Sequence, residues 1–324
     1  MSTAAATIVI TTHNRKAHLR NAILSALEQI GDNEVLVIAD ACVDGTIEMV
    51  RREFPQVRLE VSDERRGLIV QRNRAARISE APVLVSIDDD VILPSRDIVA
   101  RALACFDHPR IGAVALPHIN FIGDRTMPWF PVLPDANRRW ISRTFVGCGS
   151  ALRRDVFLQL GGYHEHLFHW GEEVDYCMRL LDAGMAVQVS DGHPIHHFPV
   201  QQDRHTKARN IYLQRNSILN HWYSAPTPFL PGLLVREAFA AFGRSLARRE
   251  LLPLQSMVLG WIACWHKRHD RRPVQPAAVR LFLALRKRQL APLDEIEPLL
   301  AEIAGARQTL AVAEPTPVTV PAGS

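Results

Sequence analysis

Apolar segments of strand length alternate with segments of helical periodicity along the first third of this chain. The apolar segments are rich in Val, Ile and Leu, which is typical of β-strands that are buried on both faces. Strands that alternate with helices in this way predict an α/β fold with a mostly parallel sheet flanked by helices. The predicted strands are 7–12, 34–40, 57–61 and 83–87, and the predicted helices are 16–29, 46–54 and 67–79.

The pattern is less regular in the rest of the chain. The segment 117–143 contains aromatic residues and prolines and predicts a loop or lid, and the pattern from residue 209 onward is mostly helical. The tail at 307–324 is rich in Ala, Pro and Thr, which predicts disorder. Further strands are predicted at 113–116 and 186–189, and further helices at 151–160 and 172–183.

Charge is distributed unevenly along the 324 residues. The net charge is +4, which is too small to indicate a nucleic-acid partner, so none is expected. Twelve Lys and Arg residues lie between positions 236 and 288, however, against three acidic residues. The region 221–306 is therefore predicted to be helical and basic. Aromatic residues alternate with these cations, which suits peripheral contact with an anionic membrane; the alternative is a helical subdomain packed on the core.

The cysteine pattern and the length of the apolar segments allow a prediction of where in the cell the protein is located. Five cysteines show neither a metal-ligand spacing nor a disulfide framework, which is typical of a reduced, cytoplasmic protein. The first residues lack a signal-peptide pattern, and the apolar stretch 251–265 is short for a membrane span and contains Gln255. We expect a cytoplasmic protein, either free or in peripheral contact with the inner face of the cell membrane.

Three consecutive carboxylates, Asp88, Asp89 and Asp90, directly follow the predicted strand 83–87. Carboxylates seldom end a core strand unless a cation meets them there. Mg²⁺ and Mn²⁺ prefer oxygen ligands and often bridge to phosphate oxygens, so a metal site is one interpretation and a solvated turn the other. Since ligands of such sheets bind beyond the carboxyl ends of the strands, the metal interpretation is favoured.

A second acidic cluster opens the predicted helix 172–183. Asp175 lies four residues before Arg179, so the two side chains can pair, and the helix dipole favours acids in the first turn. Three acids exceed what capping requires. Glu173 is therefore the candidate for a carboxylate that faces a cleft and acts as a general base towards a hydroxyl.

Short motifs occur along the chain in a characteristic order: Thr11-Thr12-His13-Asn14-Arg15, Asp40 with Asp44-Gly45-Thr46, Gly67 with Arg72-Asn73, Asp88-Asp89-Asp90, Gly161-Gly162-Tyr163 and Gly171-Glu172-Glu173-Val174-Asp175. This order resembles glycosyltransferase family 2, whose members are inverting enzymes with the GT-A nucleotide-sugar fold. The resemblance covers roughly residues 7 to 220, and Arg215-Asn216 is similar to a pair that follows in bacterial members. It implies a GT-A catalytic domain at 1–220, with a nucleotide-sugar half at about 1–115 and an acceptor half at about 116–220.

The resemblance also implies a donor site. Asp40 would hydrogen-bond the base, and Arg72 and Asn73 would lie beside the nucleotide and diphosphate. The turn Ala39-Asp40-Ala41-Cys42 differs from the Asp-Asp-Gly-Ser turn that is usual in the family. The residues expected to bind the donor are Thr11, Thr12, Asn14, Arg15, Asp40, Arg72, Asn73, Asp88 and Asp89.

The same resemblance implies a metal site and a base. Asp88 and Asp90 would hold Mn²⁺ or Mg²⁺, and His196 or His197 would complete the site as a histidine does in some members. Glu173 occupies the position of the usual catalytic Asp and is one methylene longer, so the base is either Glu173 or Glu172.

These inferences predict a metal-dependent inverting glycosyltransferase. It would move a sugar from a UDP- or dTDP-type donor to a glycan or lipid-linked acceptor in bacterial-type polysaccharide or glycolipid assembly. A nucleotidyltransferase is the enzymatic alternative, but Thr11–Arg15 lacks the Gly-rich loop with a lysine that such enzymes need. A catalytically degenerate scaffold is the non-enzymatic alternative.

Overall fold

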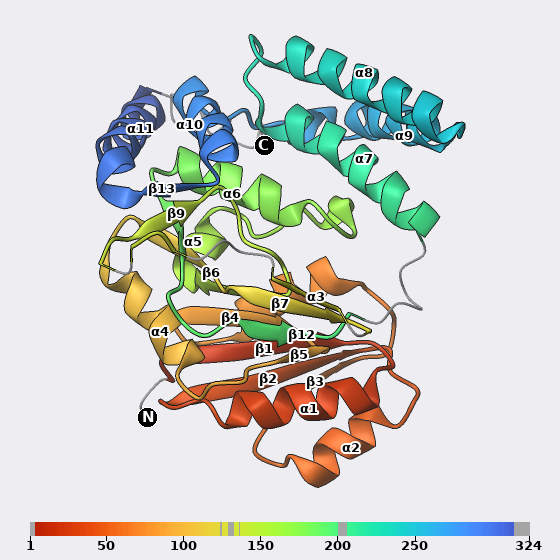
Figure 1. Ribbon diagram of the computed structural model, residues 1–324, viewed down its shortest axis with the longest axis vertical. Coiled ribbons are helices and arrows are strands. Elements are labelled where there is room, and N and C mark those ends of the chain that lie inside the picture. Colours follow the sequence, from red (N-terminus) through yellow and green to blue (C-terminus); the bar gives the residue numbers. More distant parts are fainter. Residues whose placement is uncertain (1–3, 124, 129–132, 136, 200–205, 314–324) are drawn as a thin grey trace, which may run out of the picture.

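The computed structural model of this chain describes residues 4–123, 125–128, 133–135, 137–199 and 206–313. Within these residues the main sheet has nine strands in the order β13-β9-β11-β6-β10-β4-β1-β2-β3, and a second sheet has the order β5-β12-β7-β8. Helices lie on both faces of the main sheet, and the last helices form an extension at one end of the molecule (Figure 1). The predicted α/β class with a helical C-terminal extension is confirmed.

The first four strands form the parallel part of the main sheet, as predicted. They are β1 (Ala6–Thr12), β2 (Asn33–Asp40), β3 (Arg58–Ser62) and β4 (Val83–Asp88), connected by α1 (Lys16–Leu27), α2 (Thr46–Glu53) and α3 (Leu68–Ile78). The register places Thr11 beside Asp88 and Thr12 beside Ala39. The polar residues that follow these strands therefore meet at one edge of the sheet.

Alternation of side chains gives the sheet two buried faces. In β1, Ile8 and Ile10 pack into one core cluster with Leu19 of α1, whereas Val9 packs into the other with Ile69 of α3. All five side chains are almost completely buried. The Val/Ile/Leu-rich strand sequences thus reflect helices on both sides rather than a solvated face.

The other half of the main sheet is mixed. It contains β6 (Ile111–Ala115), β9 (Trp140–Ser142), β10 (Gly149–Arg153) and β11 (Ala186–Val189), and β10 runs antiparallel to both β4 and β6. The prediction of a helix over 151–160 is wrong at its start, because α5 begins only at Arg154 and ends at Gln159. Gly149-Ser150-Ala151 has no β-branched residue and so has little strand propensity of its own. It is extended because β10 pairs with β4 on one edge and with β6 on the other.

The segment 117–143, predicted as a loop, contains a β-hairpin. Its strands are β7 (His118–Ile122) and β8 (Arg125–Pro128), while residues 124, 129–132 and 136 lie outside the described residues. In the second sheet, β12 (Ile195–His197) pairs with β7 and with β5 (Val91–Ile92), and α4 (Ile98–Ala104) follows β5. This sheet brings β12 next to the Asp triplet.

The C-terminal extension consists of helices and one added strand. Helices α7 (Thr206–Ser224), α8 (Leu230–Arg248) and α9 (Leu252–His266) pack on one another, whereas α10 (Pro276–Arg288) and α11 (Leu293–Ala313) pack on α6 (Glu172–Asp182). Strand β13 (Leu290–Pro292) pairs with β9 and so joins the main sheet, which the helical prediction did not include. Within the described part of the chain, none of the helices combines the length and the apolar character that crossing a bilayer requires.

The end of the chain differs from the prediction in part. Helix α11 continues to Ala313, so residues 307–313, expected in a disordered tail, are helical. Nη1 of Arg307 lies 2.6 Å from Oδ2 of Asp182, which ties this helix to α6. Residues 314–324 of the expected tail lie outside the described residues.

Candidate active site

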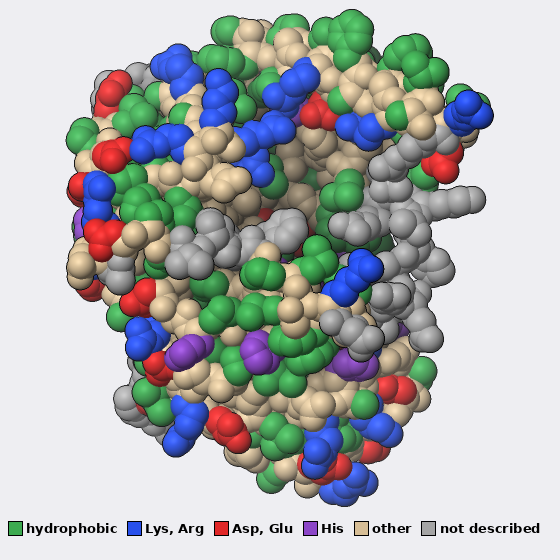
Figure 2. Space-filling view, in the orientation of Figure 1, with side chains coloured by type: hydrophobic (Ala, Val, Ile, Leu, Met, Phe, Trp, Pro, Cys, Tyr) green, Lys and Arg blue, Asp and Glu red, His purple; other side chains and the backbone are tan. Residues whose placement is uncertain are grey.

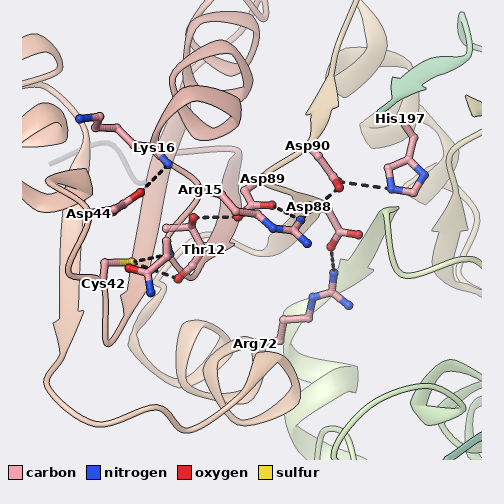
Figure 3. A network of polar contacts seen from close by, with 11 residues as sticks. Thr12, Arg15, Lys16, Cys42, Asp44, Arg72, Asp88, Asp89, Asp90 and His197 are labelled. Atoms are coloured by element: carbon pink, nitrogen blue, oxygen red, sulfur yellow. Dashed lines mark hydrogen bonds and ion pairs between the residues drawn. The ribbon is translucent and has the colours of Figure 1, made fainter. Parts of the chain in front are cut away.

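The Asp triplet forms a cluster with a histidine from the second sheet (Figure 3). Asp88 ends β4 and Asp90 precedes β5, and one ligand atom from each of Asp88, Asp90 and His197 lies within 4.8 Å of the others. Two carboxylates and one imidazole form a donor set that suits Mn²⁺ and also accommodates Mg²⁺. The coarse prediction of a metal site at this sheet edge therefore has a matching geometry.

The contacts of His197 support a cation at this position. Nδ1 of His197 lies 2.7 Å from the amide Oδ1 of Asn120, which accepts a hydrogen bond and so places the proton on Nδ1. Nε2 is then directed at Oδ1 of Asp90, 3.3 Å away, and this buried oxygen forms no well-aligned hydrogen bond. A lone pair and a carboxylate oxygen that face each other repel unless a proton or a cation lies between them.

The two candidate histidines lie on opposite faces of β12. Adjacent residues of a strand alternate in direction, so His196 points away from the carboxylates. Its ring packs instead against Phe121, with 4.9 Å between the ring centroids. The structure thus brings His197 to Asp88 and Asp90 and does not bring His196, which the sequence could not distinguish.

Asp89 connects the triplet to the loop after β1. Its buried carboxylate accepts a hydrogen bond from Thr12 Oγ1 at 2.7 Å and another from Arg15 Nη1 at 3.0 Å. Arg15 Nη1 also lies 3.1 Å from Oδ2 of Asp90. Burial raises the pKa of Asp89 to about 7, although Arg15 opposes this shift. Asp89 therefore holds the loop after β1 in place, while Asp88 and Asp90 belong to the cluster that could bind a metal ion.

Asn14 lies in the same loop and adopts a left-handed conformation with φ of 54°. Its Oδ1 accepts a hydrogen bond from the backbone N–H of Val43 at 2.7 Å, and its own N–H contacts Sγ of Cys42. The loops after β1 and β2 are thus fastened to each other beside the carboxylates (Figure 3).

Asp40, expected to contact the base, has three donors from the protein itself. Its buried carboxylate accepts hydrogen bonds from the N–H groups of Arg66 and Gly67 at 2.9 and 2.8 Å, and from Nε2 of Gln71 at 2.7 Å. These bonds fix the chain that enters α3. In this structure Asp40 therefore holds the segment before α3 against the end of β2.

Arg72 links the two acidic clusters. Its buried guanidinium lies 2.7 Å from Oδ1 of Asp88, donates to the carbonyl of Gly147 at 2.6 Å and lies 3.8 Å from Oε1 of Glu172. The next residue, Asn73, donates to the carbonyl of Tyr163 and accepts from its N–H, both at 2.9 Å. Both residues were expected beside the diphosphate, and both have internal partners in the structure.

The second acidic cluster separates into three different carboxylates. Asp175 is paired with Arg179 at 2.6 Å and with His164 at 3.1 Å, which satisfies it as a structural group. Glu172 is 2% exposed, and burial together with the negative charge of Glu173 raises its pKa to about 8. Glu173 is half-buried, and its Oε1 accepts a hydrogen bond from the Gly147 N–H at 3.0 Å. Burial raises the pKa of Glu173 as well.

Side chains of α7 hold the loop that leads into this cluster. Nδ2 of Asn216 donates to the carbonyls of Leu167 and His169 at 2.8 Å and to that of Trp170 at 2.6 Å. Trp170 has a positive φ of 63°, an unfavourable conformation for a bulky residue. Asn220 Nδ2 donates to the carbonyl of Gly171 at 2.8 Å. Arg215-Asn216 was predicted only through the family resemblance, and no local pattern indicated Asn220.

Comparisons with known proteins agree with this geometry. Residues 7–161 match the model of the family described as Glycosyl transferase family 2, and residues 130–201 match the model described as the N-terminal domain of galactosyltransferase. The succinoglycan biosynthesis protein ExoU of Rhizobium meliloti (strain 1021) is 30% identical over 207 residues, which is 56% of this chain and 58% of that protein. The uncharacterized glycosyltransferase YfnE of Bacillus subtilis (strain 168) is 31% identical over 108 residues, 32% of this chain and 27% of that protein. The chain thus spans less than two thirds of either relative.

Solved structures show the same fold. The mannosyltransferase PcManGT from Pyrobaculum calidifontis, solved with GDP-Man and Mn²⁺, has a TM-score of 0.53 at 20% identity, covering 97% of this chain and 89% of that one. Residues 1–349 of S. aureus TarS, solved with UDP-GlcNAc, have a TM-score of 0.61 at 14% identity, covering 94% and 91%. These likenesses confirm the predicted GT-A architecture.

Proposed function

Because this chain belongs to glycosyltransferase family 2, we propose that it is a metal-dependent, inverting glycosyltransferase. It would transfer a sugar from a nucleotide diphosphate to an acceptor hydroxyl. The observation that carries the proposal is the placement of Asp88, Asp90 and His197 within 4.8 Å, with Arg72 joining this cluster to Glu172. Sugar transfer needs a cation that offsets charge on the departing diphosphate and a base that accepts the proton of the acceptor hydroxyl. The cation site and the separate carboxylate cluster would meet these two needs.

The metal cluster meets the first need. Asp88, Asp90 and His197 would hold Mn²⁺ or Mg²⁺, and such an ion offsets negative charge on the departing diphosphate. Asn120 fixes the orientation of His197, and Arg15 and Thr12 fix the backbone turn through Asp89. The protein thus supplies a pre-arranged site beside the loop expected to line the nucleotide.

Glu173 meets the second need. A base must accept the proton of the acceptor hydroxyl while that oxygen attacks the anomeric carbon from the side opposite the diphosphate. Glu173 is half-buried, whereas Glu172 is buried next to Arg72. The Gly147 N–H holds one oxygen of Glu173, so the carboxylate is oriented. We assign the base to Glu173 and a structural role beside Arg72 to Glu172.

The donor and the acceptor are proposed by class. Relatives in fold bind different nucleotides, GDP-Man in one case and UDP-GlcNAc in another, and we propose a UDP- or dTDP-type sugar for this chain. The name of ExoU refers to succinoglycan biosynthesis, which supports a glycan or lipid-linked acceptor in polysaccharide or glycolipid assembly. The division into a catalytic domain at 1–220 with nucleotide and acceptor halves belongs to the same proposal, and cytoplasmic location stays a prediction.

A thermal-shift titration tests the donor site. The wild type is titrated with UDP-, dTDP- and GDP-sugars, with and without Mn²⁺, beside Asp90→Asn and the control Asp32→Asn, an exposed carboxylate remote from the triplet. We expect metal-dependent stabilisation by one nucleotide class in the wild type and the control, and its loss in Asp90→Asn. Release of free nucleotide in the presence of Mn²⁺ then separates an enzyme from a scaffold. Equal stabilisation of Asp90→Asn and the wild type would contradict the metal site.

A further inference from the structure

Helix α8 presents an apolar stripe to the outside of the molecule. Its members, Val235, Phe239, Phe242 and Leu246, are spaced four, three and four residues apart and so lie on one face of the helix. Phe239 is 73% exposed and Leu246 is 72% exposed. Another face of α8 is buried at Ala241 and Ser245, where small side chains allow close packing. Among the residues that the structure describes, none covers this stripe.

Helix α9 presents a second stripe of the same kind. Val258, Trp261, Ile262 and Trp265 follow the same helical periodicity and are exposed, with Trp265 at 69%. The other side of α9 packs on α7, where Gly260 approaches Ile218 so closely that a Cβ would clash. Because α8 and α9 pack on each other, the two stripes lie on neighbouring helices, and Leu251 between them is exposed as well. Figure 2 shows hydrophobic side chains gathered at this end of the molecule.

The chain segment that carries these stripes has a positive net charge. Residues 236–272 contain eight Lys or Arg residues against three acidic ones. The guanidinium of Arg268 lies 4.9 Å from the ring centroid of Trp265, so a cation adjoins the exposed indole directly. Among the three acids, Glu237 is paired with His221 and Asp270 with Lys267, which leaves the cations dominant.

We propose that the exposed stripes of α8 and α9 form a docking face for the surface of an anionic phospholipid bilayer. Apolar stripes rich in Trp and Phe insert at the boundary between headgroups and acyl chains, while neighbouring cations bind anionic headgroups. A symmetric contact with a second copy of the chain would place like charges opposite one another. The lipid surface satisfies both the apolar and the cationic side chains, and the inference stands independently of the donor chemistry.

Vesicle flotation tests the docking face without any activity measurement. The full chain is mixed with phosphatidylcholine vesicles with or without roughly one third phosphatidylglycerol. We expect binding to the anionic vesicles that weakens with salt. The double variant Phe239→Ala/Trp265→Ala should weaken it by on the order of ten-fold or more, because two large apolar side chains are lost. Leu24→Ala, an exposed leucine on α1 far from this face, is the matched control and should bind like the wild type.

A second variant separates charge from apolar contact. Arg236→Gln/Arg268→Gln should lose about five-fold in binding for each cation removed, with Arg51→Gln on α2 as the control. Circular dichroism and thermal melting of every variant show whether the fold is intact. Binding that is unchanged in both double variants overturns the proposal. A wild-type dimer that dissociates when Phe239 and Trp265 are replaced, with no vesicle binding, overturns it as well and assigns the face to self-association.

Discussion

Nη2 of Arg72 lies 2.7 Å from Oδ1 of Asp88, and this buried contact joins the strand-end carboxylates to the helix that carries Glu172 and Glu173. The two acidic clusters are 84 residues apart at Asp88 and Glu172. One guanidinium contacts a side chain of each cluster. The spacing between the metal cluster and the base thus depends on Arg72.

Replacing Arg72 should destabilise the protein. Arg72→Met leaves the largely buried carboxylate of Asp88 without its cation, and breaking a buried pair costs about 3–5 kcal/mol. Because Asp88 retains 28% side-chain exposure, we expect the lower end, about 3 kcal/mol, in urea denaturation. Arg51→Met, an exposed arginine on α2, is the control and should change stability little. A loss below about 1 kcal/mol would show that Arg72 does not balance the charge of Asp88.

Removing the proposed base should reduce turnover without weakening donor binding. Glu173→Gln retains the shape of the side chain and the contact with Gly147 but cannot accept a proton. We expect turnover to fall by on the order of 10²-fold or more, measured as nucleotide release with saturating donor. Glu302→Gln, an exposed residue of α11, serves as the control. If Glu172→Gln lost turnover while Glu173→Gln kept it, the assignment would reverse.

Asn216 should affect catalysis only by holding the loop before Glu172 and Glu173 in place. Asn216→Leu removes the donor to three carbonyls of the loop before Glu172, and each lost hydrogen bond costs about 1 kcal/mol. We expect a drop in thermal stability and in kcat, with the donor KM nearly unchanged because the metal cluster is untouched. Gln255→Leu on the exposed side of α9 is a control for amide removal. A change confined to the donor KM would place Asn216 in the donor site instead.

Stability should depend on pH through Glu172. Its pKa is raised by burial to about 8 in the folded protein, so the folded state binds a proton more tightly than the unfolded chain. The contribution of Glu172 to the free energy of unfolding is therefore fully present below a pH of about 4.3, which is the pKa of a glutamate in the unfolded chain. This contribution is lost as the pH rises towards about 8. Urea denaturation of metal-free protein should show a slope approaching about 1.4 kcal/mol per pH unit for this proton.

The variant Glu172→Gln isolates this effect. Asp89, with its pKa raised to about 7, contributes a slope of the same sign in both proteins, so the difference between them reports Glu172. We expect the variant to lose less stability between pH 5 and pH 8 than the wild type does. Parallel pH profiles for the two proteins would show that Glu172 is ionised in the folded state across this range.

The sequence predicted the parallel half of the fold well because its signals are local. Strands β1 to β4 and the helices between them agree with the expected ranges within a few residues. Strand β10 was missed because Gly149-Ser150-Ala151 has no strand propensity of its own and is held by partners on both edges. The hairpin within 117–143 was missed for a similar reason, since prolines and aromatic residues obscured its alternation.

The sequence by itself determined the chemistry of the site, and the tertiary structure decided its geometry. Residue type and position predicted Asp88 and Asp90 at the end of an apolar strand, and the acids in the first turn of α6, as site residues. Only the pairing of β12 with β5 and β7 placed His197, rather than His196, beside Asp90. Likewise, only packing assigned Arg72 and Asp40 to internal partners and Asn216 to the loop before α6, because hydrogen bonds between distant segments leave no pattern in the chain.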